Sequence, residues 1–266
     1  MNRLEREKFI AYIGQTYNNI QIWGQYERMV DFIFDEFPKT NTRFETIAQP
    51  LLSTISHALE LALKENLKFL HSYIDSKQLT KFDEWTHLIK SHDLKSLAEE
   101  YKIAFNRLHK QVNADKEDKN EFSKYFKKLE ELISILERNT ETYRYAEKID
   151  NDGSIVKPSI KSGKIVDFLK IKELFDELKN LFIGMPNVMA TYTDYIDFKI
   201  NNPDYKKGKG RLYLQKLFYT EDFLENVKAI LSETFAKVSD NLWIDSKTGN
   251  NYEIQIWDNH IYIILI

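Results

Sequence analysis

Apolar residues recur at three- and four-residue spacing over most of the chain, which is the period of an α-helix. Only 8 glycines and 5 prolines interrupt the sequence, so few breaks exist for a fold of many short strands. Pro38 ends the first clear run, and Gly184 with Pro186 is expected to end a later one. The runs that predict helices cover about residues 22–37, 50–74, 91–108, 121–143, 167–183, 187–200 and 220–237. Together they predict an antiparallel up-down helical bundle.

The pattern changes near the C-terminus, where β-branched and aromatic residues gather in short segments between turn residues. Leu242–Asp245, Tyr252–Trp257 and His260–Ile266 predict a small antiparallel β-meander. The last of these is so apolar that it should be buried or paired, because an exposed apolar edge promotes aggregation. We therefore expect a mainly α fold with a helical domain over 1–203 and a small α+β appendage over 204–266.

Composition narrows the function classes. The chain has no cysteine, which excludes disulfides, a thiolate nucleophile and cysteine-bound zinc. The formal net charge is −3, so no global field attracts the protein to nucleic acid or to an anionic membrane. The charged first residues do not resemble a signal peptide, and no apolar run is long enough to cross a bilayer. We expect a cytoplasmic protein with no membrane association.

A polar stripe on the second predicted helix provides the first candidate site. His57, Glu60 and Lys64 lie at positions i, i+3 and i+7, so they share one face of the helix. A histidine beside a carboxylate can perform acid–base chemistry. The alternative is an ordinary polar helix face with an i,i+4 Glu–Lys pair.

Two further candidates lie at predicted helix ends. Ser91 is a good N-cap for the third helix, and His92 follows it directly. Arg144 lies between two tyrosines at the end of the fourth helix, where a guanidinium can pair with a carboxylate or a phosphate. The structural alternatives are a capped helix start for His92 and a C-terminal cap for Arg144.

A basic run near residue 208 is a candidate for phosphate or nucleic-acid backbone binding, with a solvated loop as the alternative. It does not match the phosphate-binding loop of nucleotide triphosphatases, and the chain has no nucleophile elbow, no dinucleotide-binding glycine motif and no His-Glu-x-x-His. The six histidines are scattered, so the pattern supports no metal site, and we expect no cofactor. The residues of the run are Lys206, Lys207, Lys209 and Arg211.

Three fragments in order resemble bacterial proteins of the HEPN superfamily (higher eukaryotes and prokaryotes nucleotide-binding). They are His-x-x-Glu-Leu-x-x-Lys from His57, His-Asp-Leu-x-x-Leu from His92, and Tyr-Arg-Tyr followed by an Asp/Gly turn from Tyr143. The resemblance covers about residues 20–183. It implies a four- to five-helix up-down bundle, often homodimeric. Many such domains are ribonucleases of toxin–antitoxin, abortive-infection and other anti-phage systems, with an Arg followed by four to six residues and a His at the dimer interface.

This chain departs from that motif, because none of its arginines has a histidine five to seven residues downstream. Arg144 meets Ile149, Asp150 and Asn151 there, and Ser56 stands where related proteins tend to carry an arginine before the helix-two histidine. We expect an atypical HEPN-like ribonuclease, or an RNA- or nucleotide-binding protein, of a bacterial defence or toxin–antitoxin system. The candidate catalytic residues are His57, Glu60, His92 and Arg144. We expect them to form one cluster with Lys64, which would bind phosphate.

Two alternatives remain open. The first is a non-catalytic sensor or adaptor that binds a protein encoded by a neighbouring gene, which the missing Arg–His motif favours. The second places the function in the terminal appendage, where the aromatic-rich meander would bind a partner strand by edge addition.

Overall fold

A computed structural model describes most of the chain as two compact units. The first unit comprises Met1–Phe105 with Phe122–Phe182, and the second comprises Asn106–Glu121 with Ile183–Ile266. The residues described are 19–74, 87–136, 143, 147–149, 155–158, 165–207, 210–216, 221–257 and 260–266.

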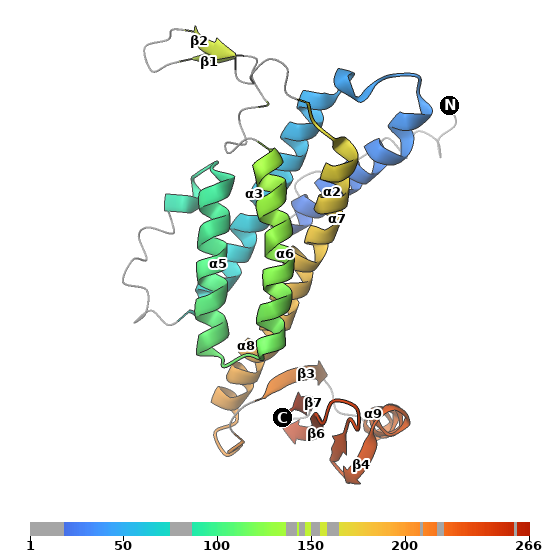
Figure 1. Cartoon of the computed structure of the whole chain (residues 1–266). Coiled ribbons are helices and arrows are strands. Elements are labelled where there is room, and N and C mark those ends of the chain that lie inside the picture. The colour runs from blue at the N-terminus through green and yellow to red at the C-terminus, as the bar shows by residue number, and fades with distance from the viewer. Residues whose placement is uncertain are drawn as a thin grey trace, which may run out of the picture. The chain divides into compact units, whose positions relative to one another are not determined.

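The first unit is a bundle of long helices (Figure 1). Its 3-10 helices, Phe37–Lys39 and Phe44–Thr46, lie between the first two long helices. The connected ends of α5 and α6 belong to the second unit. The long helices of the bundle are α2 (Asn19–Glu36), α3 (Ala48–Tyr73), α5 (Leu94–Gln111), α6 (Lys116–Ile135) and α7 (Phe168–Lys179). The segment from Lys110 to Glu121 was expected to be a loop, but α6 already begins at Lys116, where Glu117 and Asp118 favour the positive end of the helix dipole.

Helix α3 lies at the centre of the bundle and is buried over most of its length. Its leucines and alanines pack inward at helical spacing, as the periodicity predicted. Aromatic rings fill the space between α5 and α6, where Phe105 stacks on Phe122 with ring centroids 3.7 Å apart. Five buried polar residues also lie on α3: Ser56, Glu60, Lys64, Asn66 and His71. Two of them, Glu60 and Lys64, belong to the candidate site.

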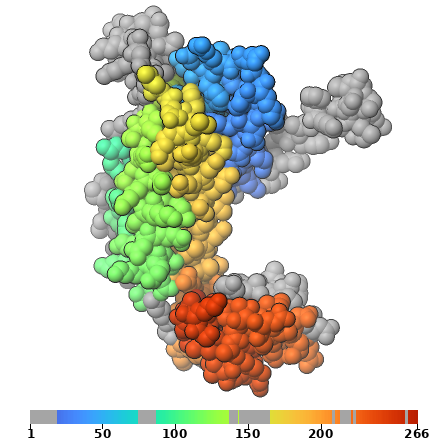
Figure 2. Space-filling view, turned by 45° about the vertical axis from the view of Figure 1, so that its right-hand side comes forward, coloured from blue at the N-terminus to red at the C-terminus, as the bar shows by residue number. Residues whose placement is uncertain are grey.

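Helices α6 and α7 lie side by side on the surface of this unit (Figures 1 and 2). Lys128 reaches Glu177 at 3.4 Å, and Lys170 reaches Glu131 at 3.0 Å. Such exposed pairs each contribute about 1 kcal/mol or less, so the apolar core rather than these pairs holds the helices together.

The predicted break at Gly184 and Pro186 is wrong, because the chain stays helical there. Helix α7 passes through a π-helical turn, Asn180–Gly184, directly into α8 (Met185–Asn201). Pro186 has no N–H to donate. The carbonyl of Phe182, four residues earlier, therefore lacks its α-helical donor, and the carbonyl of Leu181, five residues earlier, lacks its π-helical donor. Two buried side chains of the first unit provide replacements.

Tyr101 and Asn66 are these replacement donors. The hydroxyl of Tyr101 donates to the carbonyl of Leu181 at 3.0 Å, and Nδ2 of Asn66 donates to the carbonyl of Phe182 at 3.2 Å. Burial raises the pKa of Tyr101 above its ordinary range, so its hydroxyl keeps the proton that it donates. The helix therefore continues past a proline because its orphaned carbonyls are satisfied from α3 and α5.

Removing either donor should destabilise the protein. We expect Tyr101→Phe and Asn66→Leu each to lower the free energy of unfolding by about 1–3 kcal/mol, because each leaves a buried carbonyl without a donor. Urea unfolding followed by circular dichroism measures this loss. Tyr125→Phe, on the half-buried side of α6, is the matched control and should change stability by less than about 0.5 kcal/mol. Equal stability of Tyr101→Phe and the wild type would contradict the assignment.

The second unit contains a five-stranded antiparallel sheet with strand order β3-β7-β6-β5-β4. Helix α9 (Glu221–Thr234) lies between β3 and β4 in sequence. The strands are β3 (Arg211–Lys216), β4 (Ala236–Ser239), β5 (Leu242–Ile244), β6 (Asn251–Trp257) and β7 (His260–Leu265). The prediction of a mainly α fold with a small C-terminal meander is confirmed, but β3 was not predicted and β4 lies where the helix was expected to end.

The central position of β7 explains the apolar C-terminal sequence. Strand β7 pairs with β3 on one side and with β6 on the other, as its composition predicted. One face of the sheet packs on α9, where Leu224 and Leu231 meet Trp243 and Ile261. The other face packs on the end of α8, where Tyr195 and Phe198 meet Leu212 and Ile264.

Other differences concern the boundaries. Residues 147–149 and 155–158 form a small antiparallel hairpin, β1–β2, in a region expected to be a turn and a loop. The turn residues themselves, 150–153, lie outside the described residues. The predicted domain boundary lay between residues 203 and 204. The second compact unit instead already includes α8, from Ile183 onward, because the end of α8 packs against the sheet. Compactness does not measure independent folding, so that domain boundary stays a prediction.

Candidate functional site

The candidate site of the first unit is centred on a buried carboxylate of α3. The Glu60 side chain is only 3% exposed, and its Oε1 accepts a hydrogen bond from Nζ of Lys64 at 2.7 Å. The two residues are one helical turn apart, and Lys64 is itself only 10% exposed. The ammonium therefore balances the charge of a carboxylate that has been removed from water.

His92 approaches the same carboxylate from the segment that precedes α5. Its Nδ1 lies 3.1 Å from Oε1 and 3.2 Å from Oε2 of Glu60. The helix start fixes this position: Oδ1 of Asp93 accepts hydrogen bonds from the backbone N–H groups of Lys95 and Ser96. Asp93 is thus the N-cap, and the prediction that Ser91 would take this role is wrong. The Ser91 hydroxyl instead accepts from the N–H of Asp93 at 3.0 Å, in a turn that leads into the cap.

His57 lies one turn before Glu60 on α3. Its Nδ1 is 3.8 Å from Oε2 of Glu60, and its ring meets Tyr26 of α2 edge to face, with centroids 5.3 Å apart and planes at 89°. The side chains of His57 and His92 are 28% and 41% exposed. Both imidazoles are therefore accessible from solvent, while the carboxylate between them is not.

This arrangement sets the protonation pattern of His92. A carboxylate only accepts hydrogen bonds, so the Nδ1 atom that faces it carries the proton. In the neutral ring, Nε2 on the opposite edge then keeps its lone pair and can act as a base. A buried acid that orients a histidine through Nδ1 is the arrangement found in many hydrolytic active sites. The geometry can therefore support general acid–base chemistry by two histidines.

The structure brings four of the predicted site residues together: His57, Glu60, Lys64 and His92. Arg144, the fifth, lies outside the described residues, so its place in this cluster stays a prediction. Chain fragments 35 residues apart thus form one polar site through the packing of α3 against the start of α5.

The two described lysines of the predicted basic run contact other residues of the second unit. Nζ of Lys207 pairs with Glu253 at 2.9 Å, and Nζ of Lys206 donates to the carbonyl of Pro203 at 2.8 Å. Lys209 lies outside the described residues. These contacts are partly exposed, and phosphate binding by this run stays a prediction.

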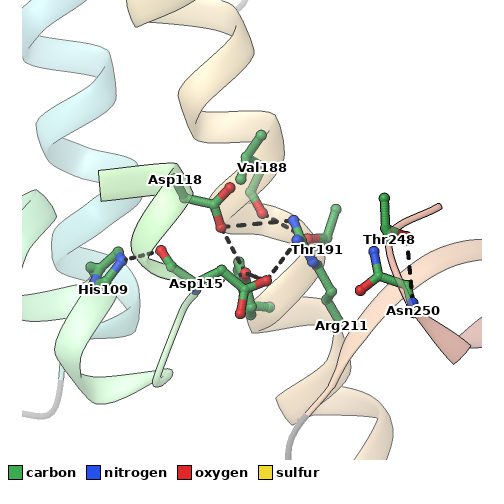
Figure 3. A network of polar contacts seen from close by, with 9 residues as sticks. His109, Asp115, Asp118, Val188, Thr191, Arg211, Thr248 and Asn250 are labelled. Atoms are coloured by element: carbon green, nitrogen blue, oxygen red, sulfur yellow. Dashed lines mark hydrogen bonds and ion pairs between the residues drawn. The ribbon is translucent and has the colours of Figure 1, made fainter. Parts of the chain in front are cut away.

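Arg211 is held by a polar network within the second unit (Figure 3). Its guanidinium reaches Asp115 at 2.8 Å and Asp118 at 3.7 Å, and it lies 4.9 Å from the centre of the Tyr192 ring. The Tyr192 hydroxyl donates to Asp118 at 2.7 Å. Burial, followed by this bond to Asp118, raises the pKa of Tyr192 above its ordinary range. Two carboxylates already balance the guanidinium, so the geometry favours a structural role for Arg211.

Sequence reasoning missed the partners of Arg211. Asp115, Asp118 and Tyr192 come from segments up to 96 residues away from it, and no local spacing links them. The only local signal was Asp118 in the first turn of a helix, where an acidic residue is common for structural reasons.

Comparison with protein-family models, with curated proteins and with solved structures finds no match for this chain. The HEPN resemblance therefore rests on the sequence fragments alone and stays a prediction.

The described residues show neither a metal site nor a membrane-spanning helix. Within the described part of the chain, no group of three or more histidine and acidic side chains could hold a metal ion. None of the described helices combines the length and the apolar composition needed to cross a bilayer. Lys64 and His92 both hydrogen-bond to the carboxylate of Glu60.

Proposed function

We propose that this chain is a HEPN-like component of a bacterial anti-phage or toxin–antitoxin system that cleaves RNA in the cytoplasm at the Glu60 site. The observation that carries the proposal is the contact of Nδ1 of His92 with both oxygens of a buried carboxylate. A second, partly exposed imidazole beside the same carboxylate provides the acid that a base alone would lack.

The chemistry follows from the two rings. Nε2 of His92 takes the proton of a ribose 2′-hydroxyl, whose oxygen attacks the adjacent phosphorus. Protonated His57 gives its Nε2 proton to the departing 5′-oxygen, so the P–O5′ bond breaks and a 2′,3′-cyclic phosphate forms. The base gains one proton and the acid loses one, and no water, metal or oxidant is consumed. Glu60 and Lys64 orient the base without contacting RNA.

Arg144 and a homodimer belong to the proposal as expectations from the resemblance. In HEPN ribonucleases the arginine stabilises the charge on the phosphate, and the site lies at the dimer interface. The described cluster instead has two histidines and no arginine. In this proposal the two histidines perform the reaction that the Arg–His pair performs in other HEPN ribonucleases.

The second candidate is a non-catalytic adaptor for a neighbour-encoded protein. The Lys64–Glu60 ion pair favours it, because the ammonium is only 10% exposed and balances the Glu60 carboxylate. Edge addition to the sheet has less support, because both edge strands are short and irregular. Strand β4 has four residues with a register shift between Lys237 and Ser239, and strand β3 has six with a shift between Leu212 and Leu214. Short, irregular, lysine-bearing edges oppose strand addition.

Incubation of purified protein with a single-stranded RNA oligonucleotide separates the two candidates. We expect cleavage by the wild type and by His87→Ala, whose histidine is exposed and lies outside the cluster. The double variant His57→Ala/His92→Ala should not cleave. Absence of cleavage by the wild type at any pH between about 5 and 8, the range in which imidazoles titrate, would reject the ribonuclease in favour of the adaptor.

A further inference from the structure

A small hollow lies at the C-terminal end of α8, within the second unit. Its volume is about 130 Å³, and its walls come from α8, from the residue that follows α8 and from β7. This volume is far below the roughly 300–1,000 Å³ of sites that enclose a drug-sized ligand. The hollow therefore has room for one functional group. Its lining residues are Asp194, Asp197, Phe198, Asn201, Asn202 and Tyr262.

Two aspartates give the hollow a negative charge. Asp194 and Asp197 are one turn apart on α8, so their carboxylates share one face of the helix. Neither forms an ion pair or a hydrogen bond within the described part of the chain. Lys199, the nearest lysine in sequence, lies instead over the ring of Tyr195, with Nζ 5.2 Å from the ring centre. Burial raises the pKa of the Asp194 carboxyl, and the charge of Asp197 raises it further. A bound cation would relieve this repulsion.

Asn202 adds an acceptor that the fold does not use. The residue is only 6% exposed. Its backbone N–H and its Nδ2 both donate to the carbonyl of Phe198, at 2.9 and 2.8 Å, and its own carbonyl accepts from the N–H of Tyr205 at 3.0 Å. Oδ1 is the polar atom of Asn202 that has no partner among the described residues. Because Asn202 lines the hollow, a donor that enters the hollow can pair with this oxygen.

Aromatic rings complete the walls of the hollow. Phe198 and Tyr262 lie with ring centroids 4.6 Å apart. Aromatic faces attract cations, and the planar guanidinium of arginine also stacks on them. A guanidinium carries five N–H donors in a fixed plane, which suits a site built from acceptors. The carboxylates, the amide oxygen and the rings thus match the chemistry of an arginine side chain.

We propose that this hollow binds the guanidinium group of an arginine side chain that a partner protein presents. Asp194 and Asp197 pair with the guanidinium, and Oδ1 of Asn202 accepts one of its N–H groups. A protein is the favoured source, because the hollow takes only the end of a side chain and the rest of the affinity must come from the surrounding surface. Arginine is enriched among the residues that dominate such interfaces. The site takes no part in RNA cleavage at Glu60, so the inference goes beyond the proposed function.

The test is an NMR titration of the nitrogen-15-labelled full chain with Nα-acetyl-arginine N-methylamide. We expect shifts in the backbone amides of residues 194–202 and a dissociation constant of about 1 mM, as for contacts of one side chain. The citrulline analogue has nearly the same shape but no charge and should not bind. The lysine analogue lacks the planar fork and should bind at least about 3-fold more weakly.

Two variants separate the hollow from the general charge of the protein. Asp194→Asn/Asp197→Asn should weaken binding of the arginine analogue at least about 10-fold, because it removes both charged acceptors. Glu221→Gln/Glu233→Gln is the matched control. It removes two exposed carboxylates of α9, changes the net charge equally and should bind like the wild type.

Equal binding by the wild type and the aspartate variant would overturn the inference, and so would absence of binding by the wild type. Equal binding of the citrulline or the lysine analogue would contradict the assignment to a guanidinium. If the double variant does not fold, the same criterion applies to Asp197→Asn alone. Sedimentation velocity tests the source: dissociation of a wild-type dimer by the arginine analogue would place the arginine in a second copy of this chain and contradict a partner protein. None of these outcomes depends on RNA cleavage.

Discussion

Replacing His92 by alanine is expected to lower the rate of RNA cleavage by about 10²- to 10⁴-fold, the usual contribution of a general base. The loss should appear in kcat rather than in KM, because His92 removes the proton of the 2′-hydroxyl and does not contribute to binding of the RNA. The Glu60 carboxylate orients the His92 ring through Nδ1. The alanine substitution therefore removes the base and leaves the carboxylate in place. Initial rates on a single-stranded RNA oligonucleotide measure the effect.

Added imidazole provides a sharper form of this experiment. Imidazole in solution can enter the space left by His92→Ala and take the same proton, so it should restore part of the lost rate. It should not restore a variant that has also lost Glu60, because the added ring then has no carboxylate to orient it. His87→Ala is the matched control and should keep the wild-type rate. Cleavage by His92→Ala at the wild-type rate would remove His92 from the reaction.

Replacing Lys64 by methionine is expected to lower the free energy of unfolding by about 3 kcal/mol. Breaking a buried ion pair leaves an uncompensated charge on Glu60, although His92 and the more distant His57 still lie beside it. Because His92 still donates, the loss should lie at the lower end of the range for such pairs. Thermal and urea unfolding measure it.

A double variant isolates the charge from the packing. Glu60→Gln/Lys64→Met removes both charges, so it should be more stable than Lys64→Met alone although it carries one more substitution. Lys68→Met is the control, since Lys68 is half-exposed and its 3.5 Å pair with Glu65 is worth about 1 kcal/mol or less. Equal effects of Lys64→Met and Lys68→Met would show that the buried pair does not stabilise the fold.

The polar cluster could be anticipated to the extent that helical spacing determines it. Positions 57, 60 and 64 must share a face of any helix that contains them. The approach of His92 to that face needed the resemblance to HEPN proteins, because spacing within one helix does not say which other segment packs against it. Tyr26 was not anticipated, because its contact with His57 depends on how α2 packs against α3.

The fold differed from expectation where distant residues override a local signal. Pro186 is a strong break signal, yet donors from Asn66 and Tyr101 satisfy the carbonyls that it orphans, and the helix continues. Strand β3 follows a glycine- and lysine-rich stretch of sequence, and β7 pairs with it from the far end of the sequence. Arg211 was grouped by its neighbours in sequence with a candidate phosphate-binding run, whereas in the structure it pairs with Asp115 and Asp118.

The products of RNA cleavage test the central claim most directly. In the proposed reaction the two imidazoles act on the 2′-hydroxyl and on the departing 5′-oxygen, so the wild type should leave a 2′,3′-cyclic phosphate and a 5′-hydroxyl. Phosphorus NMR and mass spectrometry of an oligonucleotide digest identify both ends. The account also predicts that the same oligonucleotide with 2′-deoxyriboses stays intact. Products ending in a 5′-phosphate and a 3′-hydroxyl, or cleavage of the deoxy oligonucleotide, would contradict it.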